Sequence, residues 1–246
     1  MTASYLVVIP ARLRSQRLPG KPLVDIAGKP MIVRTFEQCA KVFETDRIVV
    51  ATDADEIVSV CTSRGIPVMM TGGTHLTGTD RVAEVATSRP VDIYINVQGD
   101  EPLFDPTDLA VIRDHALAHP DTIANGYCPI RDAAEFESRM TPKVVFDQEG
   151  RLLFMSRGPI PAGKEARFRF GYRQICAYAF PPAALAAFAA HPGKTPLEEV
   201  EDIEILRFLE LGHTVRMLPM SDRSIPVDTP EDVERVEAAL RARNLD

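Results

Sequence analysis

Short apolar runs alternate with longer segments of helical periodicity through the first half of this 246-residue chain. The apolar runs predict buried strands at residues 6–9, 47–52, 67–70 and 92–97. The segments between and after them predict helices at residues 30–43, 55–64, 80–87 and 106–118. Because strands that alternate with helices form parallel sheets covered on both faces, this pattern predicts an α/β fold. Ligands of such folds bind at the carboxyl ends of the strands.

The alternation breaks between about residues 130 and 180. Residues 143–147 and 152–155 flank a Gln-Glu-Gly turn, which predicts an antiparallel hairpin. The stretch 157–169 is rich in Pro, Gly and charged residues and predicts a long loop. We interpret residues 130–180 as an antiparallel insertion that can carry a dimer interface, within one domain that spans residues 1–246.

Helical periodicity returns from residue 197, and the apolar positions of this segment are expected to face the core. These positions are Ile203, Leu206 and residues 209–211. A strand at residues 214–218 and a helix at residues 230–241 complete the predicted elements. Since 45% of the residues are hydrophobic, the chain has ample material for one large core.

Charge and cysteine content exclude several classes of protein. The net charge of −7 argues against a nucleic-acid or anionic-membrane partner. No apolar run approaches the roughly 20 residues that span a bilayer, and the chain enters its first strand without a basic leader, so we expect no signal peptide. The four cysteines are far apart and lie in apolar stretches, which predicts buried, reduced thiols in a cytoplasmic protein.

A basic loop, residues 10–23, follows the first predicted strand. It holds four cations and no acid: Arg12, Arg14, Arg17 and Lys21. Cations on a turn after a parallel strand can neutralise several phosphate oxygens, with backbone N–H groups completing the site. Gly20 is expected to permit positive φ or a close approach of the backbone. The loop does not have the spacing of a Walker A motif, and the alternative is a solvated basic loop.

Two carboxylates come at comparable strand-to-helix positions. Asp100 follows a predicted strand that ends in Gly99, and Asp228 precedes the last predicted helix. Mg²⁺ prefers one or two carboxylates together with substrate phosphates, so both are candidate ligands. The alternatives are that Asp100 shapes a turn and that Asp228 only begins a helix. With the basic loop, the two carboxylates predict metal-assisted transfer of a nucleotidyl or phosphoryl group.

The segment 77–81, Thr-Gly-Thr-Asp-Arg, begins a predicted helix with small hydrogen-bonding residues. It can contact a base or a ribose, or it can be a plain capping segment. The five histidines are scattered, so a histidine-metal site is not expected. No motif of a covalent nucleophile is present in the sequence.

At this level of detail the sequence resembles the 3-deoxy-manno-octulosonate cytidylyltransferases, or CMP-Kdo synthetases. The motifs that carry the resemblance lie at residues 9–12, 17–23, 51–53, 78–81, 96–102, 143–145, 156–157 and 227–232, and it covers nearly the whole chain. The resemblance implies a nucleotidyltransferase Rossmann-like three-layer fold, with a mostly parallel sheet and an inserted antiparallel dimerisation subdomain. It also implies Mg²⁺ as cofactor, a homodimer, and CTP and an acidic keto-sugar as substrates, with the CMP-sugar and pyrophosphate as products.

The same resemblance implies roles for matching residues. Arg12, Lys21, Asp100 and Asp228 would be catalytic, and the two aspartates would hold the metal. The nucleotide would be bound by Pro10, Ala11, Arg12, Arg17, Lys21, Gly78, Thr79, Arg81 and Gln98. The acceptor would be bound by Lys143, Arg157, Tyr172, Gln174, Tyr178 and Glu204. The anomeric hydroxyl would attack the α-phosphorus in line, and pyrophosphate would leave.

The sequence departs from the family pattern in the acceptor-binding half. A usual His-x-Gly-x-Tyr-x-Tyr strand becomes Tyr172, Gln174, Cys176 and Tyr178, and a usual Glu-Gln-Leu-Arg segment has Ile205 in place of glutamine. Losing a histidine and an amide changes the hydrogen bonds offered to the acceptor. The acceptor alternatives are therefore an 8-amino or nine-carbon acid. Two alternative functions do not involve a sugar acid. The protein can be a nucleotidyltransferase for a sugar or alcohol phosphate, or a nucleotide-binding protein without catalytic activity.

Overall fold

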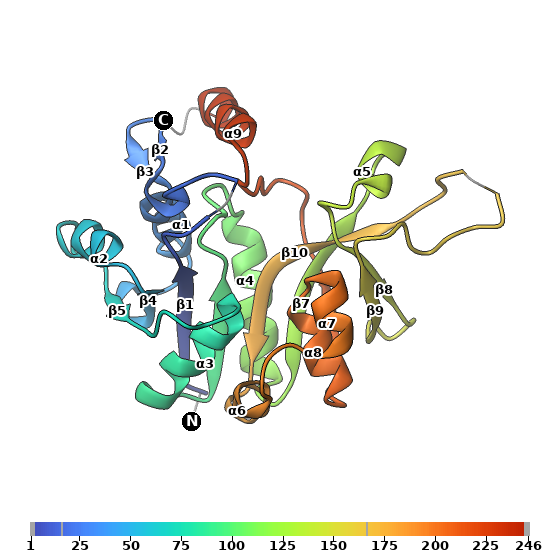
Figure 1. Ribbon diagram of the computed structural model, residues 1–246, viewed down its shortest axis with the longest axis horizontal. Helices are drawn as coiled ribbons and strands as arrows, with labels where there is room; N and C mark the ends of the chain where they lie inside the picture. Colours follow the sequence, from blue (N-terminus) through green and yellow to red (C-terminus); the bar gives the residue numbers. More distant parts are fainter. Residues whose placement is uncertain (1–2, 16, 166, 244–246) are drawn as a thin grey trace.

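The strand-helix alternation folds into a three-layer α/β/α structure, as predicted (Figure 1). The computed structural model describes residues 3–15, 17–165 and 167–243. The strands are β1 (Tyr5–Ala11), β2 (Asp25–Ile26), β3 (Lys29–Pro30), β4 (Ile48–Thr52), β5 (Val68–Met70), β6 (Ile93–Val97), β7 (Ile123–Pro129), β8 (Lys143–Phe146), β9 (Leu152–Ser156), β10 (Tyr172–Phe180) and β11 (Val215–Pro219).

The α-helices are α1 (Met31–Cys39), α2 (Asp55–Thr62), α3 (Gly78–Ser88), α4 (Pro106–Ala118), α5 (Ala133–Glu137), α6 (Pro182–Ala190), α7 (Pro196–Glu201), α8 (Ile205–Glu210) and α9 (Pro230–Arg243). Two 3-10 turns, η1 (Lys21–Leu23) and η2 (Thr45–Arg47), complete the elements. The strands and helices predicted in the first half are all present, within a few residues of the predicted bounds.

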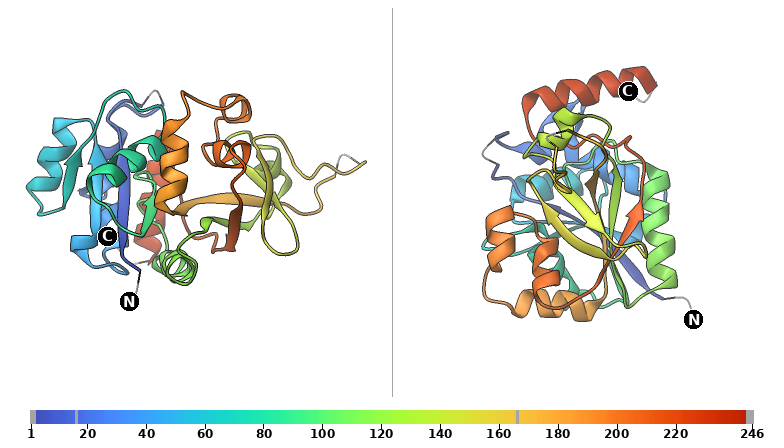
Figure 2. Two further views of the ribbon diagram at one scale, coloured as in Figure 1. Left: turned by 90° about the horizontal axis from the view of Figure 1, so that it is seen from below. Right: turned by 90° about the vertical axis from the view of Figure 1, so that its right-hand side faces the viewer.

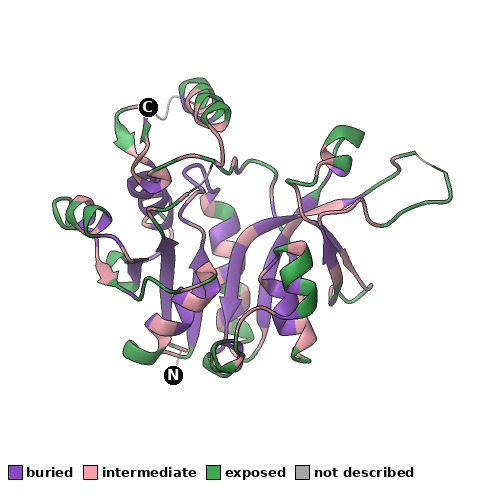
Figure 3. Cartoon of the chain, in the orientation of Figure 1, coloured by how far each residue is buried: buried purple, intermediate pink, exposed green. Residues whose placement is uncertain are grey.

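The main sheet has the strand order β11-β7-β10-β6-β1-β4-β5. β1 pairs in parallel with β4 and β6, and β11 pairs in parallel with β7. Side chains alternate between two cores: Val7 and Ile9 face α1, α2 and α4, whereas Leu6 and Val8 face α3, α6 and α8. Figures 2 and 3 show the helices on the two sides of the sheet and the buried strands between them.

β7 and β10 were not predicted as strands of the main sheet. β10 runs antiparallel between β6 and β7, and Ala177–Phe180 pairs with β6. Its other end pairs with β8, and β8 pairs with β9 in the predicted hairpin. The hairpin and the loop after β9 project from one end of the sheet (Figure 1). The start of β10, residues 172–173, thus pairs with the hairpin, and its end, residues 177–180, pairs with β6.

The helical segment predicted from residue 197 is broken in two. α7 ends at Glu201, its C-cap Asp202 has a left-handed backbone with φ 51°, and α8 follows as a separate helix. Ile203 and Leu206 are buried as predicted, but Leu211 is exposed, because the helix ends before it.

Two findings bear on the class of protein. All four cysteines are free thiols; Cys39, Cys61 and Cys128 are buried, and Cys176 is half-buried. Within the described ranges, none of the helices combines the length and the apolar character that a membrane crossing requires.

Candidate active site

A cleft of about 1110 Å³ opens at the carboxyl ends of β1 and β6. Its lining comes from the loop after β1, the start of α3, the turn after β6, residues 194–204 and Asp228. In the sheet order, β4 lies on one side of β1 and β6 on the other, so the chain reverses its winding there. Open α/β sheets bind their ligands at such a point.

One ammonium group brings the two predicted metal ligands together. Lys21 Nζ lies 2.6 Å from Asp100 Oδ2 and 2.8 Å from Asp228 Oδ1. Arg17 adds a second cation, with Nη2 2.9 Å from the same Asp228 oxygen. Burial by itself would lower the pKa of Lys21, but the two carboxylates outweigh it and raise that pKa above its usual value. The contacts join residues 79 and 207 positions apart.

Glycines allow the backbone to pack closely around this cluster. Gly20 takes a left-handed conformation, φ 68°, immediately before η1, as the sequence predicted. A Cβ at Gly99 would lie 2.8 Å from the carbonyl oxygen of Pro10, so only glycine fits beside the end of β1. The Val227 N–H donates to the Asp100 carbonyl at 2.9 Å, which ties the segments of the two aspartates together.

The start of α3 forms another side of the cleft. Thr77 caps the helix in a reciprocal capping box with Asp80. The N–H groups of Gly78 and Thr79 donate to the two carboxylate oxygens of Glu204 at 3.0 and 2.9 Å. Burial raises the pKa of Glu204, while these hydrogen bonds act in the opposite direction. The helix start therefore holds both oxygens of this carboxylate.

Gln98, Pro10 and Gly78 meet at the base of this side. A Cβ at Gly78 would lie 3.2 Å from the Gln98 amide and 3.3 Å from Pro10 Cγ. All three residues line the cleft together with Ala11. Arg81 also lines it, but its buried guanidinium group is held by Asp53 at 3.3 Å and by Thr71 and the Gly72 carbonyl.

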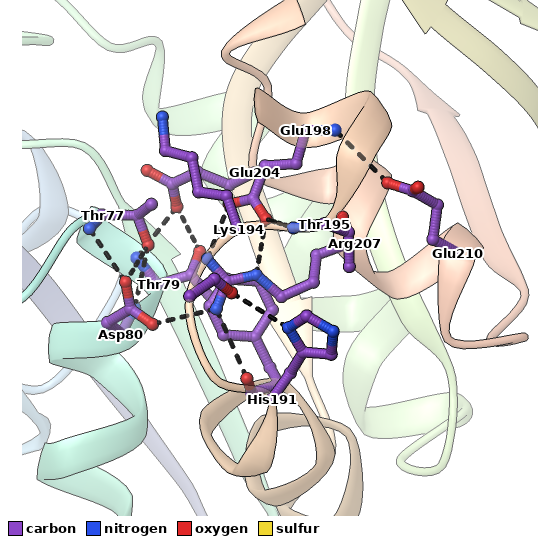
Figure 4. A network of polar contacts seen from close by, with 12 residues as sticks. Thr77, Thr79, Asp80, His191, Lys194, Thr195, Glu198, Glu204, Arg207 and Glu210 are labelled. Atoms are coloured by element: carbon purple, nitrogen blue, oxygen red, sulfur yellow. Dashed lines mark hydrogen bonds and ion pairs between the residues drawn. The ribbon is translucent and has the colours of Figure 1, made fainter. Parts of the chain in front are cut away.

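A buried ion network, which sequence reasoning missed, supports α3 from the side of α7 and α8 (Figure 4). Arg207 donates to both carboxylate oxygens of Glu198 at 2.6 and 2.7 Å and to Asp80 at 3.1 Å. Its guanidinium carbon lies 3.6 Å from the centre of the Phe188 ring. The position of Arg207, four residues after the buried Ile203, was the available signal, because it places the arginine on the core face.

Two predicted acceptor-binding residues lie in the cleft lining, Arg157 and Glu204. The Arg157 guanidinium group donates to the carbonyl oxygens of Glu201, Arg139 and Asp202 at 2.6, 3.2 and 3.0 Å. These contacts orient the side chain and still leave it at the cleft surface.

The other four, Lys143, Tyr172, Gln174 and Tyr178, are not among the described residues that line the cleft. Lys143 is fully buried, and its ammonium group donates to the carbonyls of Ser138, Thr141 and Arg157 at 2.7, 2.6 and 2.6 Å. Burial is the main cause that lowers its pKa. Lys143 is not in the cleft lining, because it holds the turn before the hairpin together.

Tyr172, Gln174 and Tyr178 lie along β10, outside the cleft lining. The Tyr172 ring packs against the rings of Tyr127 and Phe146, with centres 5.2 and 5.1 Å apart. The Gln174 amide donates to Asn125 Oδ1 at 3.0 Å and to the Tyr178 hydroxyl at 3.2 Å. The Gln174 amide and the Tyr178 hydroxyl thus bond to each other within the sheet, and the assignment of these three residues as acceptor ligands stays a prediction that mutation tests.

Loop residues without a recognisable motif complete the lining. They include His75, Arg139, Met140, Lys194 and Asp202. No periodicity or spacing marks them in the sequence, because only the tertiary fold brings them to the cleft.

The comparisons with known proteins agree with this geometry. A family model described as cytidylyltransferase matches residues 6–216. The chain is 41% identical to the 3-deoxy-manno-octulosonate cytidylyltransferase of Syntrophotalea carbinolica, covering 97% of this chain and 99% of that protein. It is 42% identical to 3-deoxy-manno-octulosonate cytidylyltransferase 2 of Burkholderia lata, covering 98% and 94%.

A solved structure of a CMP:2-keto-3-deoxy-manno-octonic acid synthetase complexed with CTP is similar over the whole fold. Its TM-score is 0.90 at 36% identity, covering 99% of this chain and 100% of that one. Sequence and structure thus lead to one conclusion: this chain belongs to the 3-deoxy-manno-octulosonate cytidylyltransferase family of the cytidylyltransferases.

Proposed function

We propose that the protein transfers the cytidylyl group of CTP to 3-deoxy-manno-octulosonate and releases pyrophosphate. The observation that carries this proposal is the meeting of Asp100 and Asp228 on the Lys21 ammonium group, at the cleft where β1 and β6 end. Cationic side chains suit a triphosphate, and carboxylates suit the metal ion that accompanies it. The names of the similar proteins support CTP and the octulosonate as substrates.

The reaction needs positioning and charge neutralisation more than covalent chemistry. The anomeric hydroxyl oxygen forms a bond to the α-phosphorus, the bond from that phosphorus to the bridging β-oxygen breaks, and the hydroxyl proton passes to solvent. Arg12, Arg17 and Lys21 would bind the triphosphate and stabilise the charge that develops on the leaving pyrophosphate. All three lie in the basic loop that lines the cleft.

The residues present fit a magnesium ion. Asp100 and Asp228 offer oxygen ligands that converge on one cation, Lys21, and both are only partly buried. Mg²⁺ keeps several waters and takes one or two carboxylates beside substrate phosphates, so two protein ligands suffice. When bound, the ion would neutralise phosphate charge and polarise the α-phosphoryl group.

The cytidine would lie against Pro10, Ala11, Gly78, Thr79 and Gln98. The Gln98 amide can both donate and accept hydrogen bonds, which suits the polar edge of a pyrimidine. Arg81 lines the same region, but its internal contacts favour a role in shaping the pocket.

Arg157 and Glu204 are the proposed acceptor-binding residues from the predicted set. Ile205 offers no amide and Tyr172 no imidazole at the matching motif positions, which keeps an 8-amino or nine-carbon acid as alternative acceptors. A cytoplasmic location and a homodimer stay predictions. The exposed side chains of Met140, Leu153 and Phe170 in the insertion support the second, and sedimentation analysis tests it.

The deciding experiment is pyrophosphate release with CTP and Mg²⁺ against a panel of acceptors. The panel contains 3-deoxy-manno-octulosonate, its 8-amino analogue, nine-carbon sialic-type acids and sugar 1-phosphates. We expect release with the octulosonate. Release with another acid alone would retain the chemistry and replace the acceptor. Release with a sugar phosphate alone would favour a nucleotidyltransferase that acts on sugar phosphates. Binding of CTP without pyrophosphate release from any acceptor would favour a non-catalytic protein.

A further inference from the structure

The segment around α7 forms one end of the cleft, and an ion pair between Lys194 and Asp202 lies there. Lys194, in the loop before α7, places its Nζ 2.6 Å from Asp202 Oδ1, at the helix end (Figure 4 labels Lys194). The lysine side chain is 19% exposed and the aspartate side chain 71%. Both residues line the cleft, together with Arg157 and Glu204.

Asp202 is held in place by its backbone as well as by its charge. It takes a left-handed conformation as the C-terminal cap of α7, and its carbonyl accepts a hydrogen bond from Arg157 Nη2 at 3.0 Å. The hydrogen bond from Lys194 is the largest influence that lowers the pKa of its carboxyl, and the charges of Lys194, Arg157 and Arg12 add to it. The backbone of Asp202 is therefore held in place, and its carboxylate pairs with Lys194.

The other acids at this end of the cleft already have partners. Glu198 is bound by Arg207, and Glu204 is bound by the start of α3. An ammonium group has three donors, and Asp202 takes one of those of Lys194. Among the residues that the structure describes, no other hydrogen-bond partner of the Lys194 ammonium group is found, which leaves two N–H groups for a ligand in the cleft.

We propose that Lys194 is an acceptor-binding residue that donates hydrogen bonds to oxygen atoms of the bound sugar acid, and that Asp202 is the residue that positions it. This assignment rests on the proposed function. The acceptor carries several hydroxyl groups and a carboxylate, all of which accept hydrogen bonds. The Gln174 amide is engaged with Asn125 and Tyr178, and the Ile205 side chain has no polar atom, so Lys194 provides donors that these two positions do not.

The test compares three variants by steady-state kinetics with CTP and the acceptor. Lys194→Met should raise the KM for the acceptor about ten-fold, as expected for a lost hydrogen bond to a charged group. The KM for CTP should stay within two-fold, because the proposal assigns Lys194 to the acceptor and not to the nucleotide. Asp202→Asn, which keeps the left-handed backbone, should raise the acceptor KM about three-fold. The double variant should match Lys194→Met, since Asp202 acts through the lysine.

The matched control is another lysine in an ion pair, Lys29→Met. Lys29 lies 2.8 Å from Glu37, away from the cleft, and this change should leave all kinetic constants unaltered. An unchanged acceptor KM in Lys194→Met, with a normal turnover number, would overturn the assignment alone. Additive effects in the double variant would overturn the positioning role of Asp202. If the unaltered enzyme shows no turnover with any of the acids, the proposed function is overturned, and this assignment with it.

Discussion

The two walls of the cleft are built in opposite ways. The first wall consists of the cleft-lining residues of the basic loop, the turn Gln98–Asp100 and Asp228, and its charged groups meet at the partly exposed Lys21. The second wall consists of Arg157 and residues 194–207, and most of its charged groups are bound to protein atoms: Glu204 to α3, Arg157 to carbonyls, and Arg207 to Glu198. The first wall presents charge to a ligand, whereas the second uses charge mainly to fix its own shape.

This difference matches the two substrates proposed for the cleft. A triphosphate with its metal ion is highly charged, and groups that can exchange partners suit it. A sugar acid is recognised by the positions of its hydroxyl groups, and fixed donors and acceptors discriminate such groups strongly. The second wall must therefore be rigid, and a buried ion network provides that rigidity.

The largest expected effect is on the second wall, where Arg207→Met removes the centre of the network. Glu198 has no exposed surface and would be left as a buried, uncompensated charge. We expect the free energy of unfolding to fall by about 3–5 kcal/mol, measured by urea denaturation. Changing both partners, as Arg207→Met with Glu198→Met, should restore most of the loss.

Arg241→Met is the control for this change, because Arg241 is 60% exposed and 3.8 Å from Glu237. Exposed pairs contribute at most about 1 kcal/mol. A similar small loss in Arg207→Met would show that the second wall does not depend on the network, and the contrast between the walls would fail.

On the first wall the largest effect should come from Asp100→Asn. A neutral amide is a poor magnesium ligand, so turnover should fall roughly a hundred-fold or more while the fold is retained. Lys21 would keep Asp228 as its partner, and circular dichroism should show an unchanged fold. The exposed Asp46 provides the control Asp46→Asn, with full activity expected. Activity of Asp100→Asn above a few per cent would remove Asp100 from the metal site.

A smaller change is expected for Asp228→Asn. Arg17 and Lys21 both bind this carboxylate, so its loss weakens the metal site and also frees two cations for the triphosphate. The Mg²⁺ concentration for half-maximal rate should rise about ten-fold or more, as measured by titration of Mg²⁺ at saturating CTP. A normal magnesium dependence would reduce Asp228 to the residue that begins α9.

The sequence alone predicted the first wall well because its contacts follow from local rules. Strands that end at the same edge of a parallel sheet bring their next residues together, which placed Arg12, Lys21 and Asp100 in one cleft. Gly20 was predicted from its turn chemistry and has φ 68°. None of this required knowledge of a side-chain packing arrangement.

The second wall could not be predicted in the same way. Whether Lys143 faces the cleft or three carbonyl groups depends on the turn at residues 138–142, which has no periodic signal. The direction of the Gln174 amide depends on Asn125, 49 residues away, whose own amide closes a bulge in β10. Matching positions to a family motif identifies such residues but not where their polar atoms point.

The smallest effect is expected for Tyr172→Phe. This variant tests whether a residue that matches a family motif also contacts the ligand. Tyr172 is a motif position, yet its ring packs with Tyr127 and Phe146 outside the cleft lining. Tyr172→Phe keeps that packing and removes only the hydroxyl group, so the KM for the acceptor should change less than two-fold. Initial-rate kinetics with the acceptor varied at saturating CTP provide the measurement. A rise of ten-fold or more would show that β10 moves its Tyr172 end toward the ligand, and the second wall would then be a surface that adapts to the acceptor instead of a rigid one.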